Sequence, residues 1–186
     1  MKNTEKGVIK IFTDGACSGN QFDENTGGWG AILEYEGKQK EFFGGTINTT
    51  NNRMEILALI EGLSALKKKQ YDIWVFSDSS YLINCLRKRW YEKWQANGWL
   101  NSNKKPVENK DLWEKLIAYL PDYEFRFFLV KGHIQAGTSD ETKKKLYERF
   151  VGHNGDGFSY EEFLVIAENN NRADELANLG IREAGL

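Results

Sequence analysis

The spacing of apolar residues at the start of the chain predicts three strands in succession. Residues 8–14, VIKIFTD, are largely apolar on both faces, which is typical of a strand inside a covered sheet. Residues 28–37 and 38–46 follow with strand-like patterns, and Gly37 between them favours a turn. Short links of this kind predict an antiparallel meander.

The pattern then changes to a helical period. Residues 49–70 carry apolar residues every three or four positions, and Asn51 and Asn52 are expected to cap the start of this helix. A short apolar run at 71–78 predicts a buried parallel strand. The remaining expected elements are helices at 79–90 and 111–120, a strand at 123–133 and a helix at 169–185. The order β-β-β-α-β-α-α-β-α predicts an α/β fold with a mixed sheet.

Composition narrows the class of protein without indicating its function. The 186 residues suit one compact domain, and Cys17 and Cys85 are too few for a disulfide framework. The net charge is −2, so any affinity for nucleic acid has to come from local patches. The sequence has no export signal and no run long enough to span a bilayer, so we expect a cytoplasmic protein that does not bind membranes.

Four acidic residues lie near the ends of predicted elements. Asp14 and Asp78 each end a strand, and Glu55 and Asp174 fall in the first turns of helices. If the two strands are neighbours, their acids face each other at the carboxyl edge of the sheet, where α/β proteins place their ligands. Taken alone, each acid is better explained as a turn or capping residue. Four together favour a site for a hard cation, Mg²⁺ or Mn²⁺, because converging carboxylates repel one another without one.

With these residues in view, the sequence resembles type 1 ribonuclease H. The matching stretches, in the family's order, are IFTDGACSGN, GGWGAIL, TNNRMEILALIEGLSALK, FSDSSYL, the tryptophan-rich segment ending in KKPVENKDLW, VKGH and NRADELAN. They cover nearly the whole chain. The resemblance implies a ribonuclease H-like fold of five mixed strands flanked by helices, as one catalytic domain over residues 1–186. It also implies an endonuclease that hydrolyses the RNA strand of RNA–DNA hybrids.

The resemblance carries the family's four metal-binding carboxylates onto Asp14, Glu55, Asp78 and Asp174. It implies two Mg²⁺ ions, for which Mn²⁺ can substitute. Asp14 would bridge both ions, Asp174 would help hold the ion that activates water, and Glu55 with Asp78 would hold the other. Two such ions about 3.5–4 Å apart suit phosphodiester cleavage to a 5′-phosphate and a 3′-hydroxyl. His133 in VKGH matches a histidine thought to help release product or shuttle a proton, the alternative being a plain surface histidine.

The resemblance also implies where the hybrid binds. Groups that reach 2′-hydroxyls distinguish RNA from DNA, and the matching residues are Cys17, Ser18, Asn20, Asn52 and Glu55. Their alternative roles are turn formation and helix capping, and both roles are compatible.

The DNA strand is expected on the tryptophan-rich segment, residues 87–110. Trp90 and Trp94, beside Tyr81, match a channel for deoxyriboses, and Thr50 and Asn109 match a pocket for one phosphate. Between residues 87 and 110 there are seven basic residues and two acidic ones, which favours backbone binding. Of these, Lys104 and Lys105 are the candidates for substrate contacts. The family often has more lysines near its tryptophans, where this chain has Gln95 and Ala96, so we expect weaker and more salt-sensitive binding.

The main departure from the family lies between His133 and Asp174. This interval is roughly thirty residues longer than the usual connection, and so long a segment is seldom without structure. Capping patterns at TSDE and SYEE predict an inserted helical hairpin over about residues 134–169, packed beside the active site where it limits the movement of His133. Its turn, GHNGDGFSYEEF, resembles part of an EF-hand calcium loop, but a glycine-rich helix–helix turn explains it better. Asn171 stands where the family often has an acid.

Two other functions remain as alternatives to the hybrid nuclease. One is a nuclease of the same superfamily with another substrate, and the other is a hybrid-binding module without activity. The four acids argue against an inactive module. We expect a monomer, and the sequence leaves open whether its task is removal of RNA primers, clearance of R-loops or another one.

Overall fold

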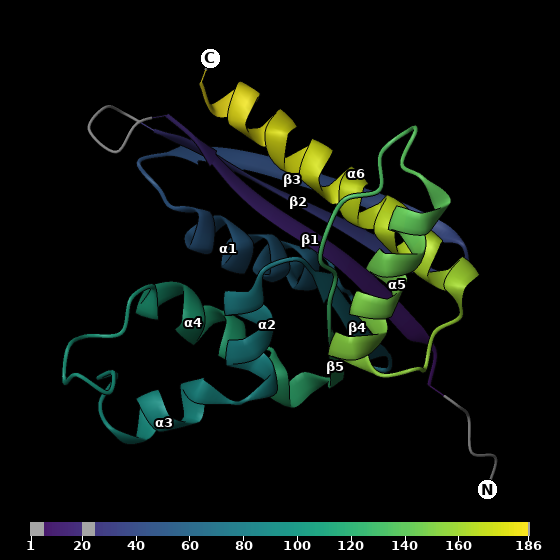
Figure 1. The fold of residues 1–186 in the computed structure, drawn as a ribbon. Coiled ribbons are helices and arrows are strands. Elements are labelled where there is room, and N and C mark those ends of the chain that lie inside the picture. Colours follow the sequence, from purple (N-terminus) through teal and green to yellow (C-terminus); the bar gives the residue numbers. More distant parts are fainter. Residues whose placement is uncertain (1–5, 20–24, 186) are drawn as a thin grey trace, which may run out of the picture.

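The computed structural model describes residues 6–19 and 25–185, which form a five-stranded sheet with helices on both faces (Figure 1). The strands are β1 (Val8–Ser18), β2 (Thr26–Tyr35), β3 (Lys38–Ile47), β4 (Asp72–Ser77) and β5 (Glu124–Leu129). The helices are α1 (Asn51–Ser64), α2 (Ser80–Arg87), α3 (Trp90–Ala96), α4 (Lys110–Ile117), α5 (Asp140–Asn154) and α6 (Tyr160–Ala184), with one 3₁₀ turn at Leu120–Asp122. No helix in the described part of the chain has both the length and the apolar character needed to cross a membrane.

The sheet has the strand order β3-β2-β1-β4-β5. The first three strands pair antiparallel, whereas β4 pairs parallel with β1 and β5 pairs parallel with β4. The predicted meander and the predicted mixed sheet are both confirmed. The parallel half matters for function, because it brings the carboxyl ends of β1 and β4 to the same edge.

Two apolar layers cover the sheet, because successive residues of a strand point to opposite faces. Ile11 packs among the apolar residues of α1, α2 and α4, and its neighbour Phe12 packs among those of α5 and α6. Figure 1 shows the same division, with α1, α2 and α4 on one side of the sheet and α6 on the other. The second layer is rich in aromatic rings, and Phe76 stacks between Phe12 and Phe128 at centroid distances of 4.9 Å.

Helix α6 lies very close to the sheet because glycines replace side chains beneath it. A Cβ at Gly28 would lie 1.9 Å from the carbonyl oxygen of Ala177, and one at Gly30 would lie 2.4 Å from that of Ala173. Gly30 is also the partner of Asp14 in the pairing of β1 with β2. The glycines therefore let the backbone of α6 rest on the strand beside Asp14.

The limits of the first helices differ from the prediction. Thr50 caps α1, with its hydroxyl accepting a hydrogen bond from the backbone N–H of Arg53 at 3.3 Å, so the expected asparagine cap is wrong. The helix ends at Ser64, before the lysine run at 67–69. The helix expected over 79–90 ends earlier, at Arg87, and a second helix that was not predicted, α3, begins at Trp90 after Arg89, which adopts a left-handed conformation with φ of 52°.

The segment after β5 contains two helices that meet at residues 155–159. Ser159 caps the second helix through a complete capping box, as the SYEE pattern predicts. The first helix is capped by Ser139, which accepts from the backbone N–H of Thr142, and not by Thr138 as a capping box at TSDE implies. The separate last helix expected from residue 169 is not observed, because α6 runs without a break to Ala184.

The composition of α6 explains this continuity. Residues 160–179 contain no glycine or proline, so nothing in the chain ends the helix. Two asparagines of the run at 169–171 direct their side chains to partners outside the helix instead of capping a new one. Asn169 accepts a hydrogen bond from Gln39 at 3.0 Å, and Asn171 bonds to the loop after β5.

Two side chains cover the outer edge of β5. Asn154, the last residue of α5, pairs with Leu129 much as a strand would. Its Oδ1 accepts from the Leu129 N–H at 2.8 Å, and its Nδ2 donates to the Leu129 carbonyl at 2.9 Å. Arg87 donates to the carbonyl of Phe127 at 2.7 and 2.9 Å and to Oδ1 of Asn154 at 2.6 Å. These bonds occupy backbone groups that are exposed at a sheet edge and tie α5 to the sheet.

The use of Asn154 in the fold also bears on the turn that resembles a calcium loop. Its side-chain oxygen and nitrogen are both engaged within the protein, which favours a helix–helix turn over a calcium loop within residues 152–163. Among the described residues, the single close group of three or more potential metal-ligating side chains lies elsewhere, at the sheet edge formed by β1 and β4.

Candidate active site

The centre of the site is formed where β1 and β4 stop pairing. The last parallel pair joins Thr13 to Ser77, and the next residue on each strand is an acid, Asp14 and Asp78. β1 itself does not end at Asp14, as the sequence suggested, because it stays paired with β2 as far as Ser18. The carboxylate of Asp14 thus extends from within β1, and that of Asp78 extends from the residue directly after β4.

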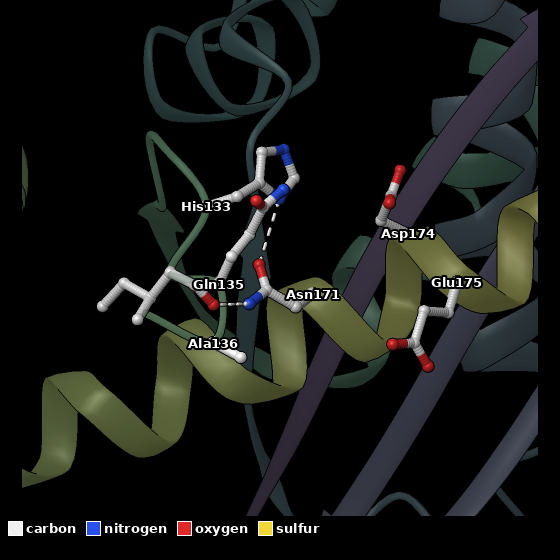
Figure 2. A pocket seen from close by; sticks show the side chains of 7 residues that line it. His133, Gln135, Ala136, Asn171, Asp174 and Glu175 are labelled. Atoms are coloured by element: carbon white, nitrogen blue, oxygen red, sulfur yellow. Dashed lines mark hydrogen bonds between the residues drawn. The ribbon is translucent and has the colours of Figure 1, made fainter. Parts of the chain in front are cut away.

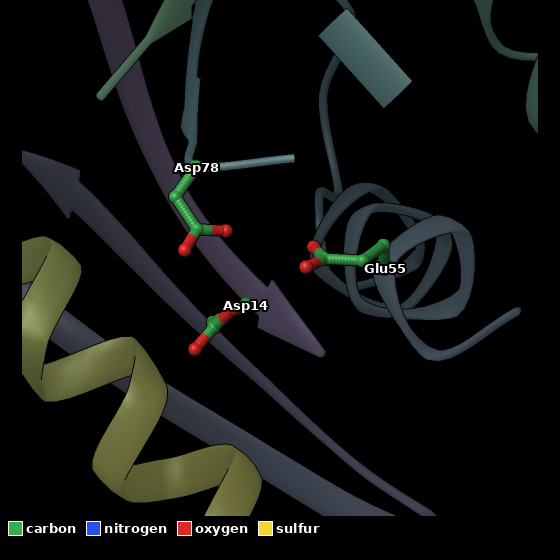
Figure 3. Close-up of side chains that lie close together, drawn as sticks. All are labelled: Asp14, Glu55 and Asp78. Atoms are coloured by element: carbon green, nitrogen blue, oxygen red, sulfur yellow. The ribbon is translucent and has the colours of Figure 1, made fainter. Parts of the chain in front are cut away.

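Glu55 reaches this place from the first turns of α1. The start of the helix lies directly on β1, since a Cβ at Gly15 would lie 2.3 Å from the backbone nitrogen of Glu55. A glycine after Asp14 is therefore what lets the helix bring Glu55 beside it. Ligand atoms of Asp14, Glu55 and Asp78 all lie within 4.8 Å of one another, and Figure 3 shows their carboxylates pointing into a common space.

The electrostatics of this group are unfavourable without a cation. Asp14 is 6% exposed and Glu55 is 7% exposed. Burial, followed by the charge of Asp78, raises the pKa of Asp14 to about 8. Burial and the charges of Asp14 and Asp78 likewise raise the pKa of Glu55 well above its usual value. None of the ion pairs between described residues includes these three acids.

The donor set fits a hard divalent cation. Oε2 of Glu55 is buried and has no hydrogen-bond partner among the described residues. A buried polar atom is normally paired, so an orphaned carboxylate oxygen beside two further carboxylates indicates a ligand. Oxygen ligands are the ones that Mg²⁺ and Mn²⁺ prefer.

Asp174 lies next to this group without belonging to its closest part. Its contact and charge help raise the pKa of Asp14, yet it is outside the set whose atoms lie within 4.8 Å. It occupies the middle of α6 and not a first turn, because that helix begins at Tyr160. Asn178, one turn later, donates to its Oδ1 at 3.3 Å.

His133 follows β5 and is exposed at the side of Asp174. A hollow runs between them, lined by His133, Ile134, Gln135, Ala136, Asn171, Asp174 and Glu175 (Figure 2). Nδ1 of His133 lies 3.0 Å from Oδ1 of Asn171. The histidine is thus held beside the carboxylates but is not one of the converging group.

The residues expected at the RNA strand lie around the exit of β1 and the start of α1. Cys17 is partly buried and Ser18 exposed at the end of β1, and Asn52 is exposed in the first turn of α1. Burial raises the pKa of the Cys17 thiol. Asn20 lies outside the described residues.

The two residues expected to hold a DNA phosphate are joined through Arg53. Thr50 accepts from the backbone of Arg53, and the guanidinium of Arg53 donates to Oδ1 of Asn109 at 3.4 Å. The same guanidinium forms a double hydrogen bond with Asp111, at 2.7 and 2.9 Å. The pair links the start of α1 to the start of α4 and so fixes the spacing of Thr50 and Asn109.

The tryptophan-rich segment rests on a buried ring. Trp113 is fully buried in α4, donates to the hydroxyl of Tyr81 at 2.9 Å and meets Trp94 edge to face at 5.6 Å. Trp90 and Trp94 are only partly buried in α3, so part of each ring is accessible. Lys104 and Lys105 are exposed in the loop after α3, where Asn101 accepts from the backbone of Lys105 at 3.1 Å.

The sequence interpretation did not single out three residues that the structure brings to the site. These are Arg53, Asn171 and Lys131, whose Nζ donates to the backbone carbonyl of Asp78. Arg53 and Lys131 lie inside motifs quoted for the resemblance, so position within a motif was an available signal. Asn171 was noticed only as a departure, because its partners come from a distant part of the chain.

Comparison with known proteins places these features in context. A family model described as RNase H matches residues 6–145, a span that ends inside α5. A protein named Ribonuclease H from Caldanaerobacter subterraneus subsp. tengcongensis is 51% identical over 151 residues, which is 81% of this chain and 92% of that protein. Another of that name from Thermoanaerobacter sp. is 52% identical over 126 residues, 68% of this chain and 79% of that protein.

A solved structure supports the fold. The crystal structure of LC11-RNase H1 in complex with RNA/DNA hybrid resembles this chain with a TM-score of 0.53 at 22% identity, over 96% of this chain and 99% of that one. At this identity the likeness concerns the arrangement of the sheet and its flanking helices.

Proposed function

The chain belongs to the ribonuclease H family, and we propose that it hydrolyses the RNA strand of RNA–DNA hybrids with divalent metal ions held at the edge of β1 and β4. The observation that carries this proposal is the convergence of Asp14, Glu55 and Asp78, the first two of them buried, with no ion pair to any of the three among the described residues. Such a group is costly to fold unless it binds cations. A nuclease of this family would use cations bound by these carboxylates to hydrolyse a phosphodiester.

The four acids divide naturally between two ions. Asp14 is central, since Glu55, Asp78 and Asp174 all influence its environment or its pKa. Glu55 and Asp78 would hold one ion with it, and Asp174 would help hold the other. Mg²⁺ is the proposed metal, with Mn²⁺ able to replace it. When bound, two divalent ions activate water and neutralise charge on the phosphate under attack.

Protons have to move during this reaction. Hydrolysis forms one P–O bond to water and breaks the bond from phosphorus to the 3′ oxygen. One proton therefore leaves the water, and one reaches the 3′ oxygen, which gives a 5′-phosphate and a 3′-hydroxyl. His133 lines the hollow that Asp174 also lines, which supports a role in carrying a proton or releasing product.

The surroundings suit the two strands of a hybrid. Cys17, Ser18 and Asn52 present polar groups on the side of Glu55, where 2′-hydroxyls would distinguish RNA from DNA. The Thr50, Arg53 and Asn109 group suits a phosphate of the DNA strand. Partly exposed tryptophan rings beside it suit deoxyriboses, and basic residues of the same segment suit the backbone.

Strand choice is the experiment that tests this function. The protein is given equal concentrations of a hybrid with labelled RNA, the same hybrid with labelled DNA, the single-stranded RNA and the all-DNA duplex, each with Mg²⁺. We expect internal cuts in the RNA of the hybrid only, with fragments that end in a 3′-hydroxyl. Cleavage of another substrate at the same rate would favour a different nuclease of the superfamily, and binding without any cleavage would favour a module without activity.

Two further expectations rest on sequence alone. We propose that the protein acts as a monomer, and light scattering after size-exclusion chromatography checks this. We also propose a cytoplasmic location, which fractionation of the source cells checks.

A further inference from the structure

His133 is held by one side chain that also holds the loop next to it. Asn171 of α6 has its Oδ1 at 3.0 Å from Nδ1 of His133, and its Nδ2 donates to the backbone carbonyl of Ile134. Figure 2 shows both bonds, with the asparagine between the ring and the loop backbone. Asn171 precedes Asp174 by three positions, so the same helix carries both residues.

The partners of Asn171 fix which way its amide is turned. The carbonyl of Ile134 can only accept a hydrogen bond, so the group that faces it has to be the NH₂ of the amide. The oxygen of the amide therefore faces the histidine. Because that oxygen can only accept, Nδ1 of His133 has to carry a proton.

The protonation of one ring nitrogen determines the role of the other. A neutral imidazole has one protonated nitrogen and one with a free lone pair. With the proton on Nδ1, the lone pair is on Nε2. In Figure 2 this second nitrogen points away from Asn171, and no dashed line reaches it.

We propose that Asn171 is a positioning residue that locks His133, which lines the hollow shared with Asp174, in the Nδ1–H tautomer and so leaves the lone pair on Nε2. This rests on the function proposed above, and it goes further by naming the nitrogen that accepts a proton and the residue that selects it. His133 would touch the reacting groups, whereas Asn171 acts only through the histidine.

The rest of the loop supports a fixed ring. On its far side, Leu146 of α5 packs against Gly132, where a Cβ would lie 2.6 Å from Cδ2 of the leucine. The loop also closes on itself, since Gln135 and Thr138 exchange hydrogen bonds at 2.9 and 3.0 Å. The residues next to His133 are thus confined by α5 on one side and by Asn171 on the other.

The tautomer can be measured without any enzymatic activity. The chain has two histidines, His133 and His153, so protein labelled with ¹⁵N-histidine gives a simple long-range ¹H–¹⁵N spectrum. In EDTA, at a pH where both rings are neutral, we expect a protonated Nδ1 and an unprotonated Nε2 for His133. His153 serves as the internal reference, since it is exposed at the end of α5.

Three variants separate this role from a general structural one. In Asn171→Ala, we expect His133 to lose its preference for Nδ1–H and resemble His153. Asn171→Asp keeps the accepting oxygen and should keep the Nδ1–H form. Gln135→Ala, in the same loop and hollow, should leave the tautomer unchanged. A wild-type His133 that is mainly Nε2–H, or an Asn171→Ala spectrum like the wild type, would overturn the proposal.

Kinetics then test whether the tautomer matters for turnover. His133→Ala should lower kcat on a hybrid by roughly 10²-fold, the lower range for an acid–base group. Asn171→Ala should lower kcat by less, with KM nearly unchanged, and the double variant should be no slower than His133→Ala. If the fold-loss in kcat of the double variant equals the two single fold-losses multiplied together, Asn171 acts independently of His133. That result would contradict its positioning role. If the wild type does not cut hybrids at all, the proposed function fails while the spectra still decide the role of Asn171.

Discussion

Asp14 and Glu55 occupy positions where a carboxylate is costly for the folded chain. Burial, followed by neighbouring charges, raises the pKa of each. The local structure nevertheless enforces their proximity, since Gly15 admits the start of α1 directly onto β1. A cost that the backbone imposes so specifically is typical of a functional site, where stability is given up for activity.

The metal-free protein should show this cost as a dependence of stability on pH. The pKa of Asp14 is about 8 in the folded state and about 4 in an unfolded chain, so the folded state binds more protons between those values. The free energy of unfolding therefore falls as the pH rises from about 4 to about 8. Asp14→Asn should accordingly unfold at a higher temperature than the wild type at pH 8 in EDTA, and the difference should shrink toward pH 4.

Circular dichroism with heating checks this prediction. About 1 kcal/mol corresponds to roughly 2–4 °C for a domain of this size, so a gain of that order is measurable. A variant that is less stable than the wild type at pH 8 would show that the acid stabilises the fold without metal.

Among the elements, α6 does the most to assemble the site. Its middle carries Asp174 and Asn171, and its close contact with Gly28 and Gly30 brings them to β1. Its first turns belong to the segment that was expected to form a separate hairpin, and they continue without a break into the part that carries these residues. One continuous helix therefore joins the segment after β5 to the residues at the edge of β1 and β4.

The bond of α5 to the sheet is the element-level feature most open to test. Asn154→Ala removes two hydrogen bonds to Leu129. The backbone N–H and carbonyl of Leu129 are then left without these partners at the edge of β5. We expect a loss of about 2–3 kcal/mol in the free energy of unfolding, since partly buried groups are left without partners. Urea titration measures it, with Asp156→Ala, exposed two residues later, as the matched control. Equal stability of the two variants would show that α5 is held to the sheet without Asn154.

For the whole molecule, the distribution of charge explains how an acidic protein can bind a polyanion. The net charge is −2, but the segment from residue 87 to 110 has seven basic residues and two acidic ones. The converging acids lie at the edge of β1 and β4, whereas the basic segment runs from the end of α2 through α3 and the loop after it to the start of α4. Cations bound by the acids would neutralise the negative charge at that edge. The basic segment could then attract the phosphate backbones of both strands of a hybrid.

Much of this arrangement could be predicted from sequence, for identifiable reasons. Strand-like apolar patterns and short links predict the meander, and Asp14 and Asp78 each come directly after an apolar run, so that pairing of the two strands places them together. The continuity of α6 could not be predicted, because a run of three asparagines looks like a helix boundary until its partners are known. The bonds of Asn171 and Asn154 join residues far apart in the chain, and no local pattern carries that information.

The central claim is that the converging carboxylates bind the metal ions needed for cleavage. Cleavage of a hybrid with labelled RNA, over a titration of Mg²⁺, tests it most directly in three proteins: the wild type, Asp14→Asn and Asp156→Asn. Asp156 is an exposed acid in the turn before α6, so its variant removes the same charge away from the site. We predict that Asp14→Asn loses cleavage by at least about 10³-fold at every Mg²⁺ concentration, the scale of removing an essential electrostatic group, while Asp156→Asn matches the wild type. Cleavage by Asp14→Asn at the wild-type rate would contradict the account.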